Sequence, residues 1–389
     1  MISDGKRFRV LALAIGLVLI HALPAAAAEN LLLSGAGSWV AVAVSKDKDE
    51  AIGIARLYEA RKARVATLKS GGFAVFFGPV KPGSIGKFRK TYQDWPDLPT
   101  DARLSRGEDF TATAWQPQDV GKAIDVTATK PVQLAQGDFA VTAALVADGG
   151  NTSLKLAGMS GSQTLFNLET AKDEFADFGS SVTIARLDPA AALPQVMVVR
   201  NTGGAHCCAA TSIASSKGPG GWMLVDGGKL DGDGYRLEDL DGDGAAELVN
   251  YDNSFFYAFD SYAASFAPIR IKRLSRDKLK DVTAEPRLRP RLAQDLAGME
   301  FLAAMDPKLW HSNGYLAAWV ATEIELGRGD MAWKRMLKSY DRHSDFNPQV
   351  CTTGQSVEDC PEGKLKQLPF PEGLAAHIKE HGYGEAPGG

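Results

Sequence analysis

The strongest constraint on the fold is a run of short apolar segments between Ile124 and Val282, separated by turns rich in Gly and Asp. Short strands at regular spacing, with turn signals between them, predict an antiparallel all-β domain. The region is too short for a propeller of four or more four-stranded blades, so we expect a sandwich or a blade-like sheet. The expected strands cover residues 139–146, 153–156, 164–168, 182–185, 195–199, 222–225, 247–251 and 269–273.

The first 28 residues have the pattern of a secretory signal peptide. Three basic residues precede the apolar run Val10–Ile20, and the small residues Ala25–Ala28 follow it. An uncleaved anchor helix is the alternative, but the apolar run falls short of the roughly 20 residues that a membrane span needs. We therefore expect cleavage near Glu29, a periplasmic or secreted protein, and no integral membrane insertion after cleavage.

The charge of the mature chain argues against a nucleic-acid partner. Removing residues 1–28 leaves 40 basic and 46 acidic residues, a net charge of −6, whereas nucleic-acid-binding domains are typically basic. One segment differs, because Arg270–Arg291 contains nine Lys or Arg and three acidic residues. It is either a solvated strand edge and linker or a patch for anionic polymers or lipid head groups.

Two further regions flank the strand-rich one. Residues 29–110 alternate as strands at 39–44, 64–68 and 73–77 around a helix at 49–62, which predicts a small β-α-β-β module. After residue 287, apolar residues recur every three or four positions, which predicts helices near 292–302, 316–324 and 333–340. The predicted fold class is multi-domain α+β. Its parts are a signal peptide at 1–28, the small α+β module at 29–110, the all-β domain at 124–282, and a helical domain with a Cys-stapled tail at 287–389.

The small module resembles the first half of a SPOR (sporulation-related) domain. The resemblance rests on Val40, Val42 and Val44 in the first strand, on the helix around Ala51 and Ala55, and on the closing segment Ala74–Pro79. It implies a module that binds septal peptidoglycan. Residues 81–110 depart from the family pattern, with Trp95-Pro96 and Leu98-Pro99 where a regular helix and strand should follow. An unrelated small α+β domain is therefore the alternative.

The sharpest motif is the acidic loop from Asp239 to Glu247. Asp239, Asp241, Asp243 and Glu247 occupy positions 1, 3, 5 and 9, with glycines between them. Together with the carbonyl of Ala245, they would converge oxygen atoms on a calcium ion, which takes six to eight such ligands. The motif resembles the calcium loop of FG-GAP repeats, the blades of integrin-like propellers. It implies a structural calcium clip between two strands; an unoccupied Asp-Gly turn is the alternative.

The mature chain has four cysteines, Cys207, Cys208, Cys351 and Cys360. An even number in an oxidising compartment predicts disulfides, and three connectivities are open. A staple between Cys351 and Cys360 would leave the neighbours Cys207 and Cys208 to pair with each other. Metal binding by His206 and the two adjacent thiols is less expected, because zinc sites usually have spaced cysteine pairs.

Ala205-His206-Cys207 resembles the stretch around the catalytic histidine of trypsin-like serine proteases, but no G-D-S-G-G motif follows. A thiol enzyme would need nucleophile and base within reach, and on a strand His206 shares a face with Cys208. We therefore expect a non-catalytic binding protein of the bacterial cell envelope, with an envelope glycan or protein as partner. The alternative is an envelope hydrolase or thiol-dependent enzyme centred on His206, Cys207 and Cys208.

Overall fold

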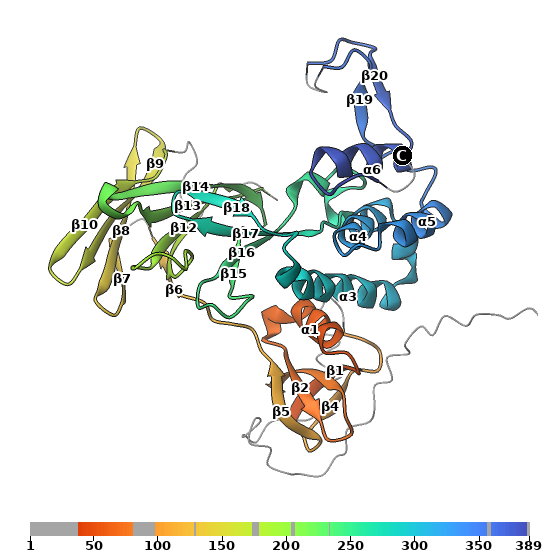
Figure 1. Cartoon of the computed structure of the whole chain (residues 1–389), viewed down its shortest axis with the longest axis horizontal. Helices are drawn as coiled ribbons and strands as arrows, with labels where there is room; N and C mark the ends of the chain where they lie inside the picture. The colour runs from red at the N-terminus through yellow and green to blue at the C-terminus, as the bar shows by residue number, and fades with distance from the viewer. Residues whose placement is uncertain are drawn as a thin grey trace, which may run out of the picture. The chain divides into compact units, whose positions relative to one another are not determined.

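We analysed a computed structural model of the chain (Figure 1). Two compact units can be distinguished, residues 1–117 and 118–389, and each is described by itself. The segment predicted as a signal peptide lies outside the residues that the structure describes. These are residues 38–80, 98–127, 130–172, 179–203, 207–232, 234–355 and 359–386.

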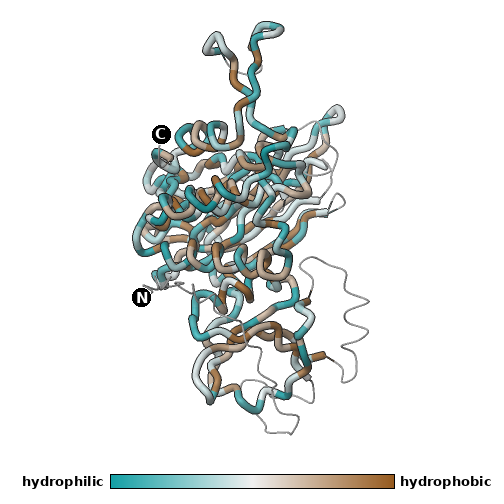
Figure 2. Tube along the Cα trace, turned by 90° about the vertical axis from the view of Figure 1, so that its right-hand side faces the viewer, coloured by the Kyte–Doolittle hydropathy of each residue, from teal (hydrophilic) through white to brown (hydrophobic). Residues whose placement is uncertain are grey.

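The first unit is a five-stranded antiparallel sheet with a helix after its first strand. The sheet order is β4-β1-β3-β2-β5, and each strand runs antiparallel to its neighbours. Its apolar strands are the brown stretches of the trace in Figure 2. The elements are β1 (Ser38–Ser45), α1 (Lys48–Leu57), the 3-10 turn η1 (Glu59–Arg61), β2 (Arg64–Leu68), β3 (Phe73–Val80), β4 (Arg103–Ser105) and β5 (Phe110–Trp115).

Local sequence explains where helix α1 begins and which face it buries. Asp47 is the N-cap, and its carboxylate accepts a hydrogen bond from Glu50 N at 2.9 Å, which satisfies one of the unpaired donors of the first turn. Ile52, Ile54 and Ala55 are buried. The sequence predicted the helix and both of its flanking strands. It did not predict β4 and β5, because the segment before them breaks the family pattern.

The described part of the second unit contains three antiparallel sheets of four or five strands, besides a two-stranded hairpin near its end. They have the orders β10-β9-β8-β7, β14-β13-β12-β11-β6 and β15-β16-β17-β18. Their strands are β6 (Lys122–Val126), β7 (Val132–Gln136), β8 (Phe139–Asp148), β9 (Asn151–Ser160), β10 (Gln163–Glu169), β11 (Ser180–Ala185), β12 (Gln195–Asn201), β13 (Cys207–Ser216), β14 (Trp222–Asp231), β15 (Arg236–Glu238), β16 (Glu247–Tyr251), β17 (Ile269–Ser275) and β18 (Lys278–Asp281).

The five-stranded sheet of the second unit, β14-β13-β12-β11-β6, is covered on both faces. On one face Ile184 and Val196 pack against Leu154 and other residues of the β7–β10 sheet. On the other, residues such as Met197 pack with Leu248 and Leu274 of the third sheet. Strand β12 is therefore an almost continuous apolar run rather than an alternating one, as expected for a strand covered on both sides. The β7–β10 sheet and the third sheet thus pack on opposite faces of the five-stranded sheet.

The C-terminal region is helical and carries a disulfide. Its elements are η5 (Pro286–Leu288), α3 (Arg289–Met305), η6 (Pro307–His311), α4 (Asn313–Glu325), α5 (Gly329–Ser339), β19 (Gln349–Cys351), β20 (Leu365–Gln367) and α6 (Phe370–Glu380). Leu292 of α3 packs with Val249 and Ile271 of the third sheet, and α4 is almost entirely buried. None of the helices in the described part of the chain is long and apolar enough to cross a membrane.

The tail of the chain contains a short strand pair and the helix α6. Strands β19 and β20 pair as a hairpin, which is labelled near the top of Figure 1. Cys351 and Cys360 are joined by a disulfide, as the local-staple interpretation predicted. The structure thus has mostly sheets, a few helices, and a helical C-terminal region with a disulfide, while the predicted domain boundaries remain predictions.

Candidate functional site

The acidic loop between β15 and β16 is held by its own first carboxylate. Gly242 N and Gly244 N donate to the two oxygens of Asp239 at 2.8 and 3.1 Å. Both glycines have positive φ, 76° and 82°, which glycine adopts without steric cost. The loop therefore curls as its glycine pattern predicted.

The other predicted ligands lie in the same turn. Ala245 is buried, and its N–H donates to Asp243 Oδ1 at 2.8 Å. A carboxylate oxygen from each of Asp239, Asp241 and Glu247 lies within 4.8 Å of the others. Glu247 is fully buried. The structure therefore brings together three of the four carboxylates that the motif singled out, without Asp243.

Two arginines contact the same carboxylates. Arg273 Nη2 lies 2.7 Å from Asp241 Oδ2 and 3.3 Å from Asp243 Oδ2, and it also bonds Glu247. Arg287 bonds Asp241. Burial disfavours the charge of Arg273, but the bonds to Glu247 and Asp241 outweigh burial and raise its pKa. A calcium ion would have to compete with Arg273 for these oxygens, so the site fits the ion only if that guanidinium leaves.

The same pairing corrects one interpretation of the basic segment 270–291. Arg291 is buried and its Nε lies 3.3 Å from Glu238 Oε2. Arg270 is paired with Asp252 and Glu325. Together with Arg273 and Arg287, these arginines are neutralised by carboxylates of the second unit. The idea of a basic surface patch is therefore wrong for these four residues.

Most of the predicted reactive site lies outside the described residues: His206 does, and so does the side chain of Cys207. Strand β13 begins at Cys207, and Thr202 Oγ1 accepts a hydrogen bond from Cys208 N at 2.9 Å. Cys208 is disulfide-bonded. In this oxidation state Cys208 has no thiol to act as a nucleophile.

A buried polar cluster, which we call the Arg270 cluster, joins the third sheet to the helical region. Arg270 Nε lies 3.0 Å from Asp252 Oδ2 and Nη1 lies 3.1 Å from Glu325 Oε1. Nη2 donates to the carbonyl of His381 at 2.6 Å. The guanidinium also lies over the ring of Tyr383, 3.7 Å from its centroid, and Tyr383 OH donates to Asp252 at 2.8 Å. One cation thus holds segments from four parts of the chain.

Two groups in this region have strongly shifted titrations. Burial raises the pKa of Glu325 to about 7 although Arg270 opposes the shift, and Glu325 Oε2 has no hydrogen-bond partner among the described residues. Burial, with His381 adding to it, lowers the pKa of His377 to about 4. Near neutral pH His377 is therefore uncharged, whereas Glu325 is close to its titration midpoint.

Ser254, His377 and Asp252 do not form a catalytic triad. Ser254 Oγ donates to Asp252 at 2.7 Å and lies 3.2 Å from His377 Nε2. In a triad the carboxylate orients the histidine, whereas here it bonds the serine. The His377 ring packs instead against Phe255 and Phe259, at 4.6 and 5.1 Å between centroids. The histidine is a half-buried packing residue.

Sequence reasoning missed the Arg270 cluster. Its members are separated by up to 131 residues, so no local spacing links them. The one available signal was the density of arginines in 270–291, which indicates internal ion pairs when acidic residues are equally abundant nearby.

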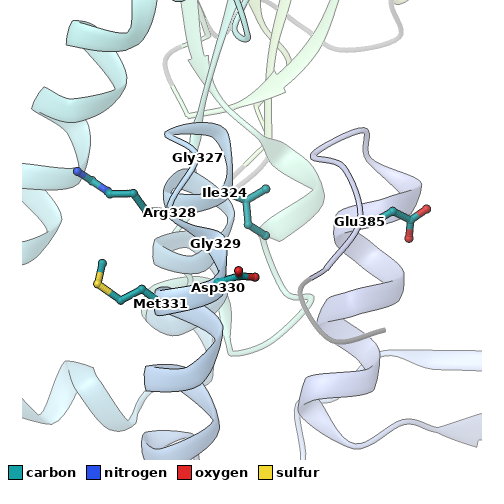
Figure 3. A pocket seen from close by; sticks show the side chains of 7 residues that line it. All are labelled: Ile324, Gly327, Arg328, Gly329, Asp330, Met331 and Glu385. Atoms are coloured by element: carbon teal, nitrogen blue, oxygen red, sulfur yellow. The ribbon is translucent and has the colours of Figure 1, made fainter.

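A cavity of about 530 Å³ lies beside the start of α5. Ile324 and Asp330 point toward the segment that carries Glu385, while Arg328 and Met331 point away (Figure 3). Arg328 is paired with Glu323 at 2.5 Å. The remaining charged groups of the lining are the carboxylates of Asp330 and Glu385. Asp330 lies in the first turn of α5, and Arg328 is at the N-cap position.

Comparison with known proteins relates the helical region to a described domain. A family model named the sll0997 C-terminal domain matches residues 292–382, which include Glu325 and His381 of the Arg270 cluster. No solved structure matches the chain.

Two curated relatives are each 36% identical to the chain. One, "Uncharacterized protein y4bJ" from Sinorhizobium fredii, matches over 388 residues, 97% of this chain and 60% of the relative. The other, "Probable thylakoid lumen protein sll0997" from Synechocystis sp., matches over 198 residues, 50% of this chain and 57% of the relative. The matches thus span about three fifths of the length of these relatives.

We expect His377→Gln to change how stability depends on pH. The unfolded chain takes up a proton at His377 as the pH falls through 6.5, but the folded chain does so only near 4. The native chain should therefore lose roughly 1–3 kcal/mol relative to the variant between pH 6.5 and 4.5. Urea unfolding at several pH values measures the difference.

Glu325→Gln is the matched variant, and its effect has the opposite sign. The folded chain keeps the Glu325 proton up to about pH 7, whereas the unfolded chain releases it near 4.5. The native chain should lose stability relative to this variant as the pH rises from 5 to 7.5. If the free energy of unfolding depends on pH in the same way for the native chain and both variants, both shifted pKa values are contradicted.

Proposed function

We propose that the chain is an exported, non-catalytic binding protein of a cell envelope. The observation that carries the proposal is the relative named a thylakoid lumen protein, together with the signal-like start of the sequence and the Cys351–Cys360 disulfide. Disulfides persist mainly in oxidising compartments outside the cytosol. A periplasmic or secreted location follows from the same features.

Peptidoglycan is the proposed ligand of the first unit. Support comes from its topology, since β4-β1-β3-β2 is the strand order of a split β-α-β fold, with α1 between β1 and β2. The SPOR resemblance covers β1, β2 and β3 of this order, whereas β4 lies in the segment that departs from the family pattern. Fold-level likeness alone does not carry function, so the proposal depends on a binding test.

The test is co-sedimentation of the mature chain, residues 29–389, with purified peptidoglycan sacculi. We expect the chain to bind and the 118–389 unit to bind at least tenfold less, because the SPOR-like sheet lies in the first unit. Residues 29–117 alone are the matched control and should retain binding. If the 29–389 chain stays in the supernatant, peptidoglycan is not the ligand.

We further propose that the acidic loop takes calcium as a structural ion only when Arg273 is displaced. Asp239, Asp241, Asp243, Glu247 and the carbonyl of Ala245 would hold the ion, which would supply charge neutralisation between strands β15 and β16. What favours this is the convergence of three carboxylates. What weakens it is that Arg273 bonds the same oxygens.

Arg273→Gln should therefore increase the response to calcium. Removing the competing guanidinium leaves buried Glu247 with the longer contact to Arg287, at 3.7 Å, so added calcium should stabilise the variant by about 1–3 kcal/mol and the native chain by less. Thermal unfolding with calcium and with chelator measures this. Asp241→Asn in the variant background should abolish the gain, and Arg276→Gln is the control for loss of a nearby positive charge. If calcium stabilises the native chain as much as the Arg273→Gln variant, Arg273 does not compete with the ion.

A further inference from the structure

The segment between β16 and β17 is a loop whose two ends are hydrogen-bonded to each other. Asp252 N donates to the carbonyl of Pro268 at 2.9 Å, and Asp252 is also bound to Arg270. The two ends of the loop therefore meet, as in the compact Ω-loops that often carry function. We call residues 252–268 the aromatic loop.

Two buried rings fix this loop from inside. Phe255 and Phe259 are 1% and 0% exposed and belong to the core of the helical region. Both pack against His377. Arg270 thus fixes the start of the loop through Asp252, and the buried rings of Phe255 and Phe259 fix its middle. The residues between these two rings therefore have little freedom to move.

Tyr257, between Phe255 and Phe259, turns outward under backbone strain. It is 57% exposed, and its φ is 61°, in the left-handed region that suits glycine. A bulky residue there costs of order 1–3 kcal/mol, and such outliers cluster at binding sites. Ser265 Oγ accepts a hydrogen bond from Tyr257 N at 3.1 Å, which holds the strained backbone. The strained backbone thus directs the ring of Tyr257 toward solvent.

Two more rings extend the surface around Tyr257. The ring centroids of Tyr257 and Tyr262 are 5.3 Å apart, and those of Tyr262 and Phe256 are 5.4 Å apart. Burial is the main cause that raises the pKa of Tyr262, and the nearby charge of Asp231 adds to it. Phe256 and Tyr262 are half-buried, and Phe256 packs on the core of the helical region. The loop therefore presents one exposed ring, that of Tyr257, joined to two half-buried rings beside an acidic group.

We propose that Tyr257, Tyr262 and Phe256 form a stacking platform for a neutral sugar ring of an envelope glycan, a second and weaker glycan contact that goes beyond the peptidoglycan binding proposed for the first unit. A sugar ring has an apolar C–H face that packs on an aromatic ring and hydroxyl groups that suit a neighbouring acidic group. Tyrosine supplies contact area of this kind at low entropy cost. Anionic ligands are disfavoured by Asp231 and by the net charge of −6.

The test is titration of the full mature chain with two neutral probes, chitotriose and cellotriose, followed by NMR or calorimetry. Tyr257→Gly should weaken binding at least tenfold. Glycine accepts the positive φ, so this variant should keep its melting temperature, which separates loss of binding from loss of fold. Tyr262→Ala should weaken binding as well. Phe346→Ala removes another exposed ring, in the segment before β19, and should leave binding unchanged.

Three outcomes would overturn the platform. They are no binding of either sugar, sugar binding that Tyr257→Gly leaves intact, and binding of hexalysine or citrate in place of the sugars. The sacculus test is independent of these results. If the chain binds sacculi but not the free sugars, the proposed function is supported and the platform is contradicted. If the chain binds the sugars through Tyr257 but does not bind sacculi, the platform is supported and peptidoglycan is excluded as the ligand.

Discussion

The guanidinium of Arg270 is the contact on which the second unit depends. It lies on a strand of the third sheet, and its partners come from the aromatic loop, from the end of α4 and from the segment after α6. Its side chain is 12% exposed and that of Glu325 is 6% exposed. Breaking such a buried pair by removing one partner costs about 3–5 kcal/mol, because the other charge is left without compensation.

Paired arginines recur along the boundary between the third sheet and the helices. Arg273 and Arg287 bond the acidic loop, and Arg291 of α3 bonds Glu238 of β15. Beneath them the contact is apolar, with Leu292 against Ile271. The sheet is therefore fixed to the helical region by burial of apolar area, while the ion pairs specify which side chains meet. This arrangement gives the loops between the strands a rigid base.

Local patterns were enough to predict most of the elements, but not the contacts between them. Strand β12 and helix α4 follow from their apolar sequences, and the curl of the acidic loop follows from Gly242 and Gly244. Strand β13 was missed because small residues such as Ala209 and Ala210 give no alternation of apolar and polar side chains. The Arg273 contacts to the acidic loop and the strained φ of Tyr257 are set by tertiary packing, which no spacing in the sequence encodes.

If Arg270 holds the aromatic loop in place, removing its charge should expose the backbone amides of the loop to exchange. Amide hydrogen exchange of the native chain and of Arg270→Gln tests it most directly, with Lys278→Gln as a control that removes an exposed positive charge from β18. We predict that exchange in residues 253–267 rises at least tenfold in Arg270→Gln, whereas strand β12 keeps its native protection and the control matches the native chain. Unchanged exchange of residues 253–267 in Arg270→Gln would contradict the account, since the loop would then be held by its buried rings alone.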